Sequence, residues 1–232
     1  MSTTTPTETF DLAEVEPRTL NAALHDPACD GARFRVVNPR GRHALAVGAV
    51  AGAHVDIKGH AGYYCAGMNQ HAEVRVRGNA GVGVAENMMS GTVVVEGDAS
   101  ASAGATAHGG LLVVNGSAAA RCAISLKGAD VVVRGSVGHL SAFMAQSGRL
   151  LVCGDAGDAL GDSIYEARLY VRGTVRGLGA DCIEKEVGDE HLAEIAGLLD
   201  RAGIDDVAPG EFRRYGSARG LYHWNAEHHQ TY

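Results

Sequence analysis

The chain has 232 residues and a formal net charge of −7 at pH 7, and 32 of its residues are glycine. The acidic balance argues against a surface for nucleic acid or for an anionic membrane, and no run of 18 apolar residues predicts a transmembrane helix. The opening stretch MSTTTPTETF lacks the basic and apolar regions of a signal peptide. Since the five cysteines include no C-x-x-C pair, we expect a cytoplasmic protein without a metal centre of its own.

Three consecutive units are expected along the chain. Residues 1–34 form an N-terminal extension, residues 35–187 a repeat domain, and residues 188–232 a capping helix followed by an aromatic and basic docking tail. Within the extension, the stretch EPRTLNAALHDPA places Leu20 and Leu24 on one side of a short helix.

A short tag, Val-x-Val-x-Gly, returns every 19 residues through the repeat domain. Its closing glycines, which we interpret as structural, are Gly59, Gly78, Gly97, Gly116, Gly135, Gly154 and Gly173. The residues two and four positions before each glycine are apolar in every copy, as in a strand with one face inward. The residue after each glycine is polar and suits a turn. The seventh residue after it is always Gly or Ala, which indicates a close approach of the backbone.

The constant interval predicts an all-β solenoid, a right-handed parallel β-helix of about seven 19-residue coils. At a spacing of about 4.8 Å between strands, seven coils would make a rod about 34 Å long. A β-sandwich has irregular loop lengths, and a propeller blade needs about 40 residues or more. Neither alternative explains six successive intervals of 19.

The position three residues before each tag glycine should point out of the rod. Asp56 and Arg75 occupy it in the first two coils. The next five coils place apolar residues there, which are Val94, Val113, Val132, Leu151 and Tyr170. Five apolar side chains in a row on an outer face indicate a surface that is covered. The cover is either the chain's own C-terminal segment or another subunit, and we interpret this apolar stripe as a candidate partner interface.

A helix is predicted over residues 189–202, after the last coil. Asp189 suits its N-cap and Gly203 its end. Its apolar side consists of Leu192, Ile195, Leu198, Leu199 and Ala202. Because the last coil of a solenoid has an unpaired edge, we expect this helix to lie over that edge as a lid.

The C-terminal tail interleaves aromatic and basic residues. It contributes further candidates for the partner interface, namely Phe212, Arg213, Arg214, Tyr215, Arg219, Tyr222 and Trp224. Packing against the chain's own rod and docking into a partner with the arginines at the rim both remain open.

The sequence predicts no catalytic, cofactor-binding or metal-binding residue on this chain. The histidines fall at different positions of their coils, so that they form no ladder of ligands along the rod. Asp162 and Asp181 occupy the same position in neighbouring coils, where they bind a cation or are simply solvated. The alternative is a stand-alone enzyme with a site around His71, His108 and Asp162.

Two stretches carry a resemblance to a known family. NPRGRHALAVGA and the repeated units in VRGNAGVGVAENMMSGTVVVEGDASASAGATAHGG resemble the GXGXG domain, the C-terminal β-helix of the large chain of glutamate synthase. The resemblance covers about residues 35–187. The matching positions are structural: Arg42, Val47, Gly48 and the tag glycines. The free-standing length and the ending FRRYGSARGLYHWN are most similar to the glxC-type, glutamate synthase-like subunits, among them the second subunit of N-methylglutamate synthase.

The resemblance implies a structural subunit without catalytic residues of its own. It would brace a class II amidotransferase-like subunit and a subunit that carries FMN and iron–sulfur clusters. N-methylglutamate synthase converts L-glutamate and methylamine into N-methyl-L-glutamate and ammonia, and this is the complex that the resemblance favours. The alternative within the same resemblance is the corresponding scaffold subunit of formylmethanofuran dehydrogenase.

Overall fold

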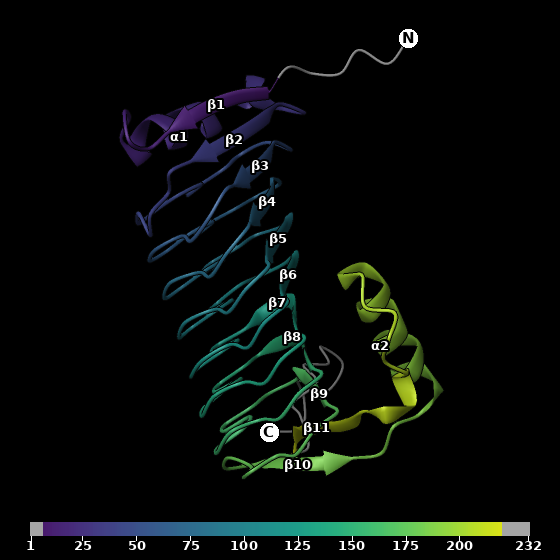
Figure 1. Ribbon diagram of the computed structural model, residues 1–232. Coiled ribbons are helices and arrows are strands. Elements are labelled where there is room, and N and C mark those ends of the chain that lie inside the picture. Colours follow the sequence, from purple (N-terminus) through teal and green to yellow (C-terminus); the bar gives the residue numbers. More distant parts are fainter. Residues whose placement is uncertain (1–6, 220–232) are drawn as a thin grey trace, which may run out of the picture.

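A stack of short parallel strands forms the body of the protein in the computed structural model, which describes residues 7–219 (Figure 1). The seven strands of the repeat domain are β3 (His54–Ile57), β4 (Glu73–Val76), β5 (Thr92–Val95), β6 (Leu111–Val114), β7 (Lys127–Val133), β8 (Ser147–Val152) and β9 (Arg168–Val171). Each pairs in parallel with the next, and paired residues such as Val55 and Val74 lie 19 positions apart. The predicted parallel solenoid of about seven 19-residue coils is therefore confirmed.

The core of the rod is built from thin layers of small and branched side chains. Both inward columns of the tag are buried, and Val74 and Val76, for example, are 1% and 0% exposed. A second column of backbone bridges follows the turns, beginning with Ala61 opposite Ala80. The Gly and Ala column has a left-handed backbone in most coils, with φ of 55° at Ala66. Tyr64 and Leu140 have similar φ angles, so the burial of this layer in most coils, and not the left-handed backbone, explains why the column contains only Gly and Ala.

The polar residue after each tag glycine forms a ladder along the rod. The Asn79 side chain accepts a hydrogen bond from the backbone N–H of Asp98 (3.0 Å), and the Asp98 side chain accepts one from the N–H of Ser117 (2.8 Å). The same 19-residue step repeats from His60 to Thr174. Each coil thereby satisfies a backbone donor of the next coil, so that this column needs a hydrogen-bond acceptor.

The tag glycines are required by close packing and, with one exception, not by a left-handed backbone. Only Gly59 has a positive φ, of 144°. A Cβ at Gly116 would lie 2.7 Å from the Gly97 carbonyl oxygen and 2.8 Å from its carbon. At Gly116 the backbone of the preceding coil therefore occupies the space that a side chain would take.

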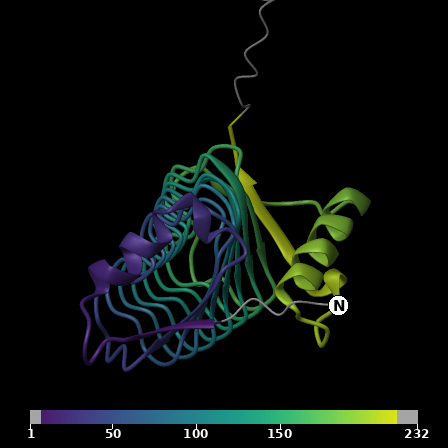
Figure 2. The ribbon, with the colours of Figure 1, turned by 90° about the horizontal axis from the view of Figure 1, so that it is seen from above.

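The N-terminal end of the rod has its own cap. β1 (Thr7–Asp11) pairs in parallel with β2 (Arg33–Val37), and β2 pairs with β3. Between them, α1 (Pro17–Leu24) and the 3-10 turn η1 (Pro27–Cys29) lie across the top coil (Figure 2). Leu20 and Leu24 of α1 are fully buried in the main core. The predicted boundary between residues 34 and 35 falls inside β2, since the N-terminal extension continues the sheet.

The C-terminal end is closed by two antiparallel strands. β10 (Cys182–Lys185) and β11 (Arg213–Ser217) give the sheet order β9-β11-β10 at this end. The 3-10 turn η2 (Pro209–Glu211) precedes β11. The strand β11 therefore covers the edge of the last coil, where a helical lid was expected. Its Tyr215 is opposite Leu169 and joins the core.

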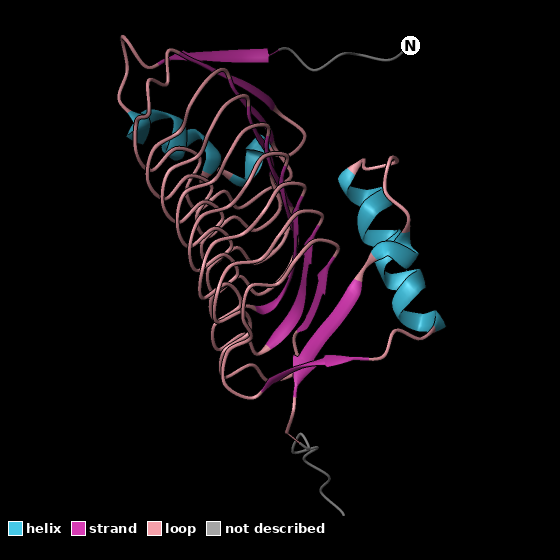
Figure 3. Ribbon diagram, turned by 60° about the horizontal axis from the view of Figure 1, so that its bottom comes forward, coloured by secondary structure: helices cyan, strands magenta, loops and turns pink. Residues whose placement is uncertain are grey.

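The helix α2 (Asp189–Ala202) stands beside the stack, against the outer face of the sheet (Figures 1 and 3). Its predicted range is correct, and Gly203 ends it with φ of 70°. The N-cap is Gly188, one residue before the expected Asp189. Asp189 and Glu190 lie in the first turn, where their charges interact favourably with the helix dipole. As a lateral cover, α2 has a different role from the predicted lid over the last coil.

Candidate functional site

The apolar stripe predicted as a partner interface is covered by the chain's own helix α2. Val113, Val132, Leu151 and Tyr170 are at most 2% exposed. They pack in one cluster with residues of α2 and of the segment that follows it, which are Ile195, Leu198, Leu199, Ile204 and Phe212. Val94, at the N-terminal end of the stripe, is partly buried against this cluster. The stripe is thus an internal contact and leaves only Val94 beside an open surface.

Ion pairs fasten α2 to the sheet on both sides of this apolar cluster. Glu194 of α2 accepts hydrogen bonds from Arg149 Nη1 (3.2 Å), Arg168 Nη1 (2.7 Å) and the Tyr170 hydroxyl. Asp130 of β7, whose side chain is 6% exposed, accepts from Arg149 Nε (2.6 Å) and from Arg201 Nη1 of α2 (2.6 Å).

Burial and the hydrogen bond to Glu194 both raise the pKa of Tyr170 above its ordinary value. The hydroxyl therefore stays protonated as a donor, and Arg149 links the two acidic residues into one network.

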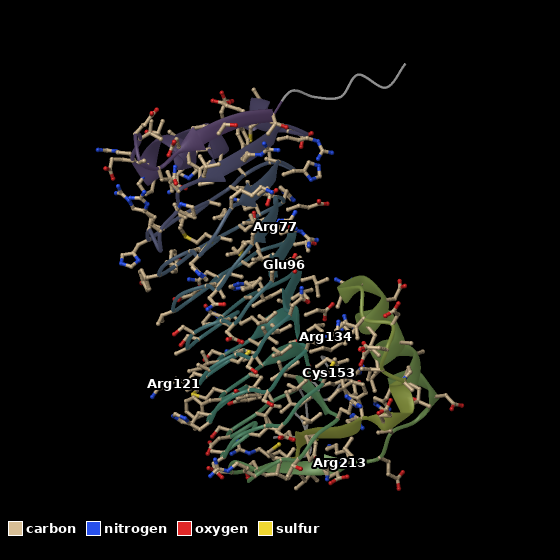
Figure 4. The ribbon with its side chains drawn as sticks, in the orientation of Figure 1. Arg77, Glu96, Arg121, Arg134, Cys153 and Arg213 are labelled. Carbon is tan, nitrogen blue, oxygen red and sulfur yellow. The ribbon has the colours of Figure 1, made fainter. Side chains whose placement is uncertain are left out.

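The outer face of the sheet over β2–β5 is open and charged. Asp56 forms ion pairs with Lys58 (2.5 Å) and Arg77 (2.8 Å), and Glu96 pairs with Arg75. Burial raises the pKa of Asp56, but hydrogen bonds from Arg77 and Lys58 lower it by more, so that its pKa is below the ordinary value. Arg77 and Glu96 lie on this face in Figure 4, above the end of α2. Most of the charges are therefore matched within the chain.

A groove of about 970 Å³ runs between this open face and the C-terminal end of α2. Arg33 and Arg35 of β2 line it, together with Val94 and the end of α2 from Asp200 to Gly203. Both arginines are exposed, and neither forms an ion pair with a described residue. The groove therefore offers two free cationic groups to a partner.

The tail residues divide between the core and the surface. Phe212 and Tyr215 are 4% and 2% exposed. Of the two alternatives for these residues, the structure therefore shows packing against the chain's own rod. Arg213 is exposed beside the Tyr215 ring, and Arg214 is half-buried. Arg219 is exposed and pairs with Asp181. Two further candidates, Tyr222 and Trp224, lie outside the described residues.

No family model matches the chain. Protein GlxC of Rhizobium meliloti (strain 1021) is 59% identical to it over 225 residues, which are 96% of this chain and 99% of that protein. The chain belongs to the GlxC family. The match thus covers nearly the whole length of both chains.

The residues of the stand-alone enzyme alternative are not brought into one site in this GlxC-family chain. The imidazole of His71 contacts the Ser90 hydroxyl (3.1 Å), and Asp162 accepts from the Ser163 hydroxyl (2.8 Å) and the Ala180 N–H (3.3 Å). No hydrogen bond or ion pair among residues 7–219 joins these groups to each other or to His108. The same range contains no cluster of three or more His, Cys, Asp or Glu residues placed to hold a metal ion.

All five cysteines are buried as free thiols. Burial raises the pKa of Cys65 and of Cys122 to about 12. Because the thiolate is the reactive form, these two thiols act as small apolar groups of the core. Among the described helices, none is both long and apolar enough to span a membrane.

Proposed function

We propose that this GlxC-family chain is a structural subunit of a glutamate synthase-like complex, most specifically N-methylglutamate synthase. It would hold a class II amidotransferase-like subunit and a subunit with FMN and iron–sulfur clusters in position. The complex would convert L-glutamate and methylamine into N-methyl-L-glutamate and ammonia. The chemistry would take place on the partner subunits, and this chain would contribute shape and contact surface.

The observation that carries the proposal is the unbroken stack of coils. The 19-residue register continues from β3 to β9, and the repeat motifs that form it are those that resemble the glutamate synthase β-helix. The core is tightly layered and the ends are closed by α1 and β11. A stack of this kind is a stiff spacer, and stiffness is what a brace between two catalytic subunits requires.

The partner surface is expected on the groove over β2–β5, since α2 occupies the apolar stripe. Arg33 and Arg35 present cationic groups there, and Val94 adds an apolar contact at the rim. A partner with acidic and apolar side chains would complement this combination. Tyr222 and Trp224 of the tail remain candidates for a second contact.

Reconstitution from purified subunits tests the proposal. The amidotransferase-like and flavin-containing subunits are mixed with and without this chain, and the stable assembly is measured by sedimentation. Formation of N-methyl-L-glutamate from L-glutamate and methylamine is then measured by chromatography. We expect both assembly and product formation to require this chain. Full assembly and full activity of the other two subunits alone would contradict the proposal.

Charge reversal tests the location of the partner surface separately. The double variant Arg33→Glu/Arg35→Glu should weaken assembly at least about tenfold, because it opposes the expected acidic partner surface. The control is Arg121→Glu, an exposed arginine on the opposite flank of the rod (Figure 4). Equal assembly of the two variants would place the interface elsewhere without affecting the structural role itself.

A further inference from the structure

A second pocket, of about 520 Å³, lies between the N-terminal half of α2 and the last coils of the rod. Its lining contains four cationic side chains, Arg149, Arg168, Lys185 and Arg214, and two carboxylates, Glu166 and Glu194. The lining thus has a formal excess of two positive charges, although the whole chain carries a net charge of −7. A local excess of the opposite sign in a concave site attracts anions.

The four cations are arranged as two cross-strand pairs of like charge. Arg149 of β8 lies directly opposite Arg168 of β9. Lys185 of β10 lies directly opposite Arg214 of β11. Like charges directly opposite each other destabilise a sheet, so that each pair calls for an anion between its members.

The first pair has its anion within the chain. One carboxylate oxygen of Glu194 accepts from both Arg149 Nη1 (3.2 Å) and Arg168 Nη1 (2.7 Å). The Glu194 side chain is only 15% exposed, so this bridge is formed where solvent screens charge weakly. At the first pair, this pocket therefore already contains a carboxylate, that of Glu194, bound between two neighbouring cations.

The second pair has no such anion among residues 7–219. Neither Lys185 nor Arg214 forms an ion pair in the described part of the chain. Arg214 Nη1 donates to the Glu186 backbone carbonyl (3.1 Å), while Arg214 Nε is buried and has no hydrogen-bond partner. A buried guanidinium donor without an acceptor is costly, and Arg214 Nε is the one buried side-chain polar atom in this condition among the described residues.

Small residues of β11 contribute to the lining of the pocket near the second pair. The Lys185 stem lies over Gly216, where a Cβ would be 3.6 Å from Lys185 Cδ. Gly216 and Ser217 of β11, which are opposite Ile183 and Cys182 of β10, also line the pocket. The volume falls in the range of about 300–1,000 Å³ that is typical of sites for small molecules.

We propose that this pocket binds a small oxyanion, a carboxylate or phosphate group, between Lys185 and Arg214. The ligand would repeat at the second pair what Glu194 does at the first. It would accept hydrogen bonds from the Lys185 ammonium group and from the guanidinium of Arg214. The site belongs to this chain alone, so the inference does not depend on the proposed partner subunits.

Thermal unfolding of the full chain tests the proposal with two probes, inorganic phosphate and glutarate, at constant ionic strength. Binding to the folded state raises the melting temperature with a saturating dependence on ligand concentration. Phosphate also stabilises proteins by exclusion from their surface, but that effect does not saturate. The probe with the lower half-saturation concentration identifies the source of the anion as a phosphate or a carboxylate ligand.

Three variants make the test specific. Lys185→Gln should raise the half-saturation concentration at least about tenfold, and Lys185→Arg, which keeps the charge, should stay within about threefold of the unmodified chain. Arg121→Gln removes one positive charge on the opposite flank and should leave the half-saturation concentration unchanged. Lys185→Gln should also raise the melting temperature in anion-free, low-salt buffer, because it removes the repulsion from Arg214.

Two results would overturn the proposal. In one, neither probe gives a saturating shift with the unmodified chain. In the other, the shift saturates at the same concentration in Lys185→Gln and in Arg121→Gln, which would assign it to a site away from the second cation pair.

Discussion

The two halves of one sheet face differ in how they meet solvent. Over β2–β4 the outward side chains are mostly charged, and several of them form ion pairs, as Asp56 does with Arg77. At β5 the outward position becomes apolar with Val94. Over β6–β9 the same coil position is apolar, and Val132 and Leu151 are completely buried under α2. The residues of the repeated tag keep the same 19-residue offset in both halves, although an irregularity between Lys127 and Asp130 shifts the start of the β7–β8 pairing. The polarity of one side chain per coil therefore decides whether the face stays open or needs a cover.

The comparison also separates two uses of charge. On the open face, ion pairs join side chains that are about one-third to one-half exposed, so that water screens them. On the covered face, Asp130 and Glu194 are 6% and 15% exposed and bind arginines from both the sheet and the adjoining elements. The first group matches charges on an open face, and the second group joins α2 to the strands of the rod.

A charge placed under α2 should have the largest effect. Val132→Asp puts a carboxylate at a fully buried position of the apolar cluster. We expect a loss of more than about 3 kcal/mol in the free energy of unfolding, because a buried charge without a partner is costly. Arg75→Gln, at the same coil position on the open face, should cost less than about 1 kcal/mol. Urea denaturation of both variants measures the difference, and equal losses would contradict the division into two halves.

Removal of one carboxylate from each face should give the next largest effect. Glu194→Gln leaves Arg149 and Arg168 without their shared anion, and we expect a loss of about 1.5–3 kcal/mol. Glu73→Gln removes the partner of His54, at 2.8 Å, from an exposed pair, and should cost less than about 1 kcal/mol. Urea denaturation measures both losses in the free energy of unfolding. Equal losses for Glu73→Gln and Glu194→Gln would contradict the proposed difference between the open and the covered face.

The sequence predicted the features that repeat. Three features recur in all seven coils. They are the apolar residues two and four positions before each tag glycine, the polar residue directly after it, and the Gly or Ala seven residues after it. The amphipathic pattern also predicted α2, because Ile195, Leu198 and Leu199 recur with helical spacing. These parts depend on local periodicity, which a single sequence contains in full.

The sequence did not predict the features that occur once. An apolar stripe indicates a cover but does not identify it, and the partner assignment for Val113, Val132, Leu151 and Tyr170 therefore needed the position of α2. The five-residue strand β11 has no periodic signal, and its pairing with β9 joins residues that are 42 to 46 positions apart. The pairing of Lys185 with Arg214 depends on the same antiparallel register. Contacts of this kind follow from tertiary packing and not from local pattern.

The tag glycines occur in both halves of the rod, so a substitution at one of them tests a feature that the two halves share. Gly116→Ala brings a Cβ against the backbone of Gly97, and we expect a loss of about 1–3 kcal/mol from overpacking. Gly197→Ala is the matched control, because nothing lies within 4 Å of its added Cβ on the exposed side of α2. The control should gain about 0.5–1 kcal/mol from helix propensity. Urea denaturation measures the change in the free energy of unfolding for each variant. A loss for Gly116→Ala with a gain for Gly197→Ala supports a steric role for the tag glycine, and a loss for both variants would contradict it.

The smallest expected effect is a difference in pH dependence between the halves. The pKa of Asp56 is below its ordinary value of 3.8, since the hydrogen bonds from Arg77 and Lys58 outweigh the effect of burial. The stabilisation of the open face is therefore present above that value and is lost as the pH falls through the folded-state pKa. The pKa of Tyr170 is above its ordinary value of 10.0 because of burial and its bond to Glu194.

For Tyr170 the sign is the reverse. Its contribution is complete below pH 10.0 and is lost as the pH rises above that value toward the folded-state pKa. Stability profiles measured by urea denaturation should therefore lose acid dependence in Asp56→Asn and alkaline dependence in Tyr170→Phe. The two variants change different parts of the profile, the acid part and the alkaline part. An alkaline slope that is unchanged in Tyr170→Phe would show that the raised pKa of Tyr170 does not contribute to stability. The open face is thus expected to weaken first in acid, and the contact with α2 first in alkali.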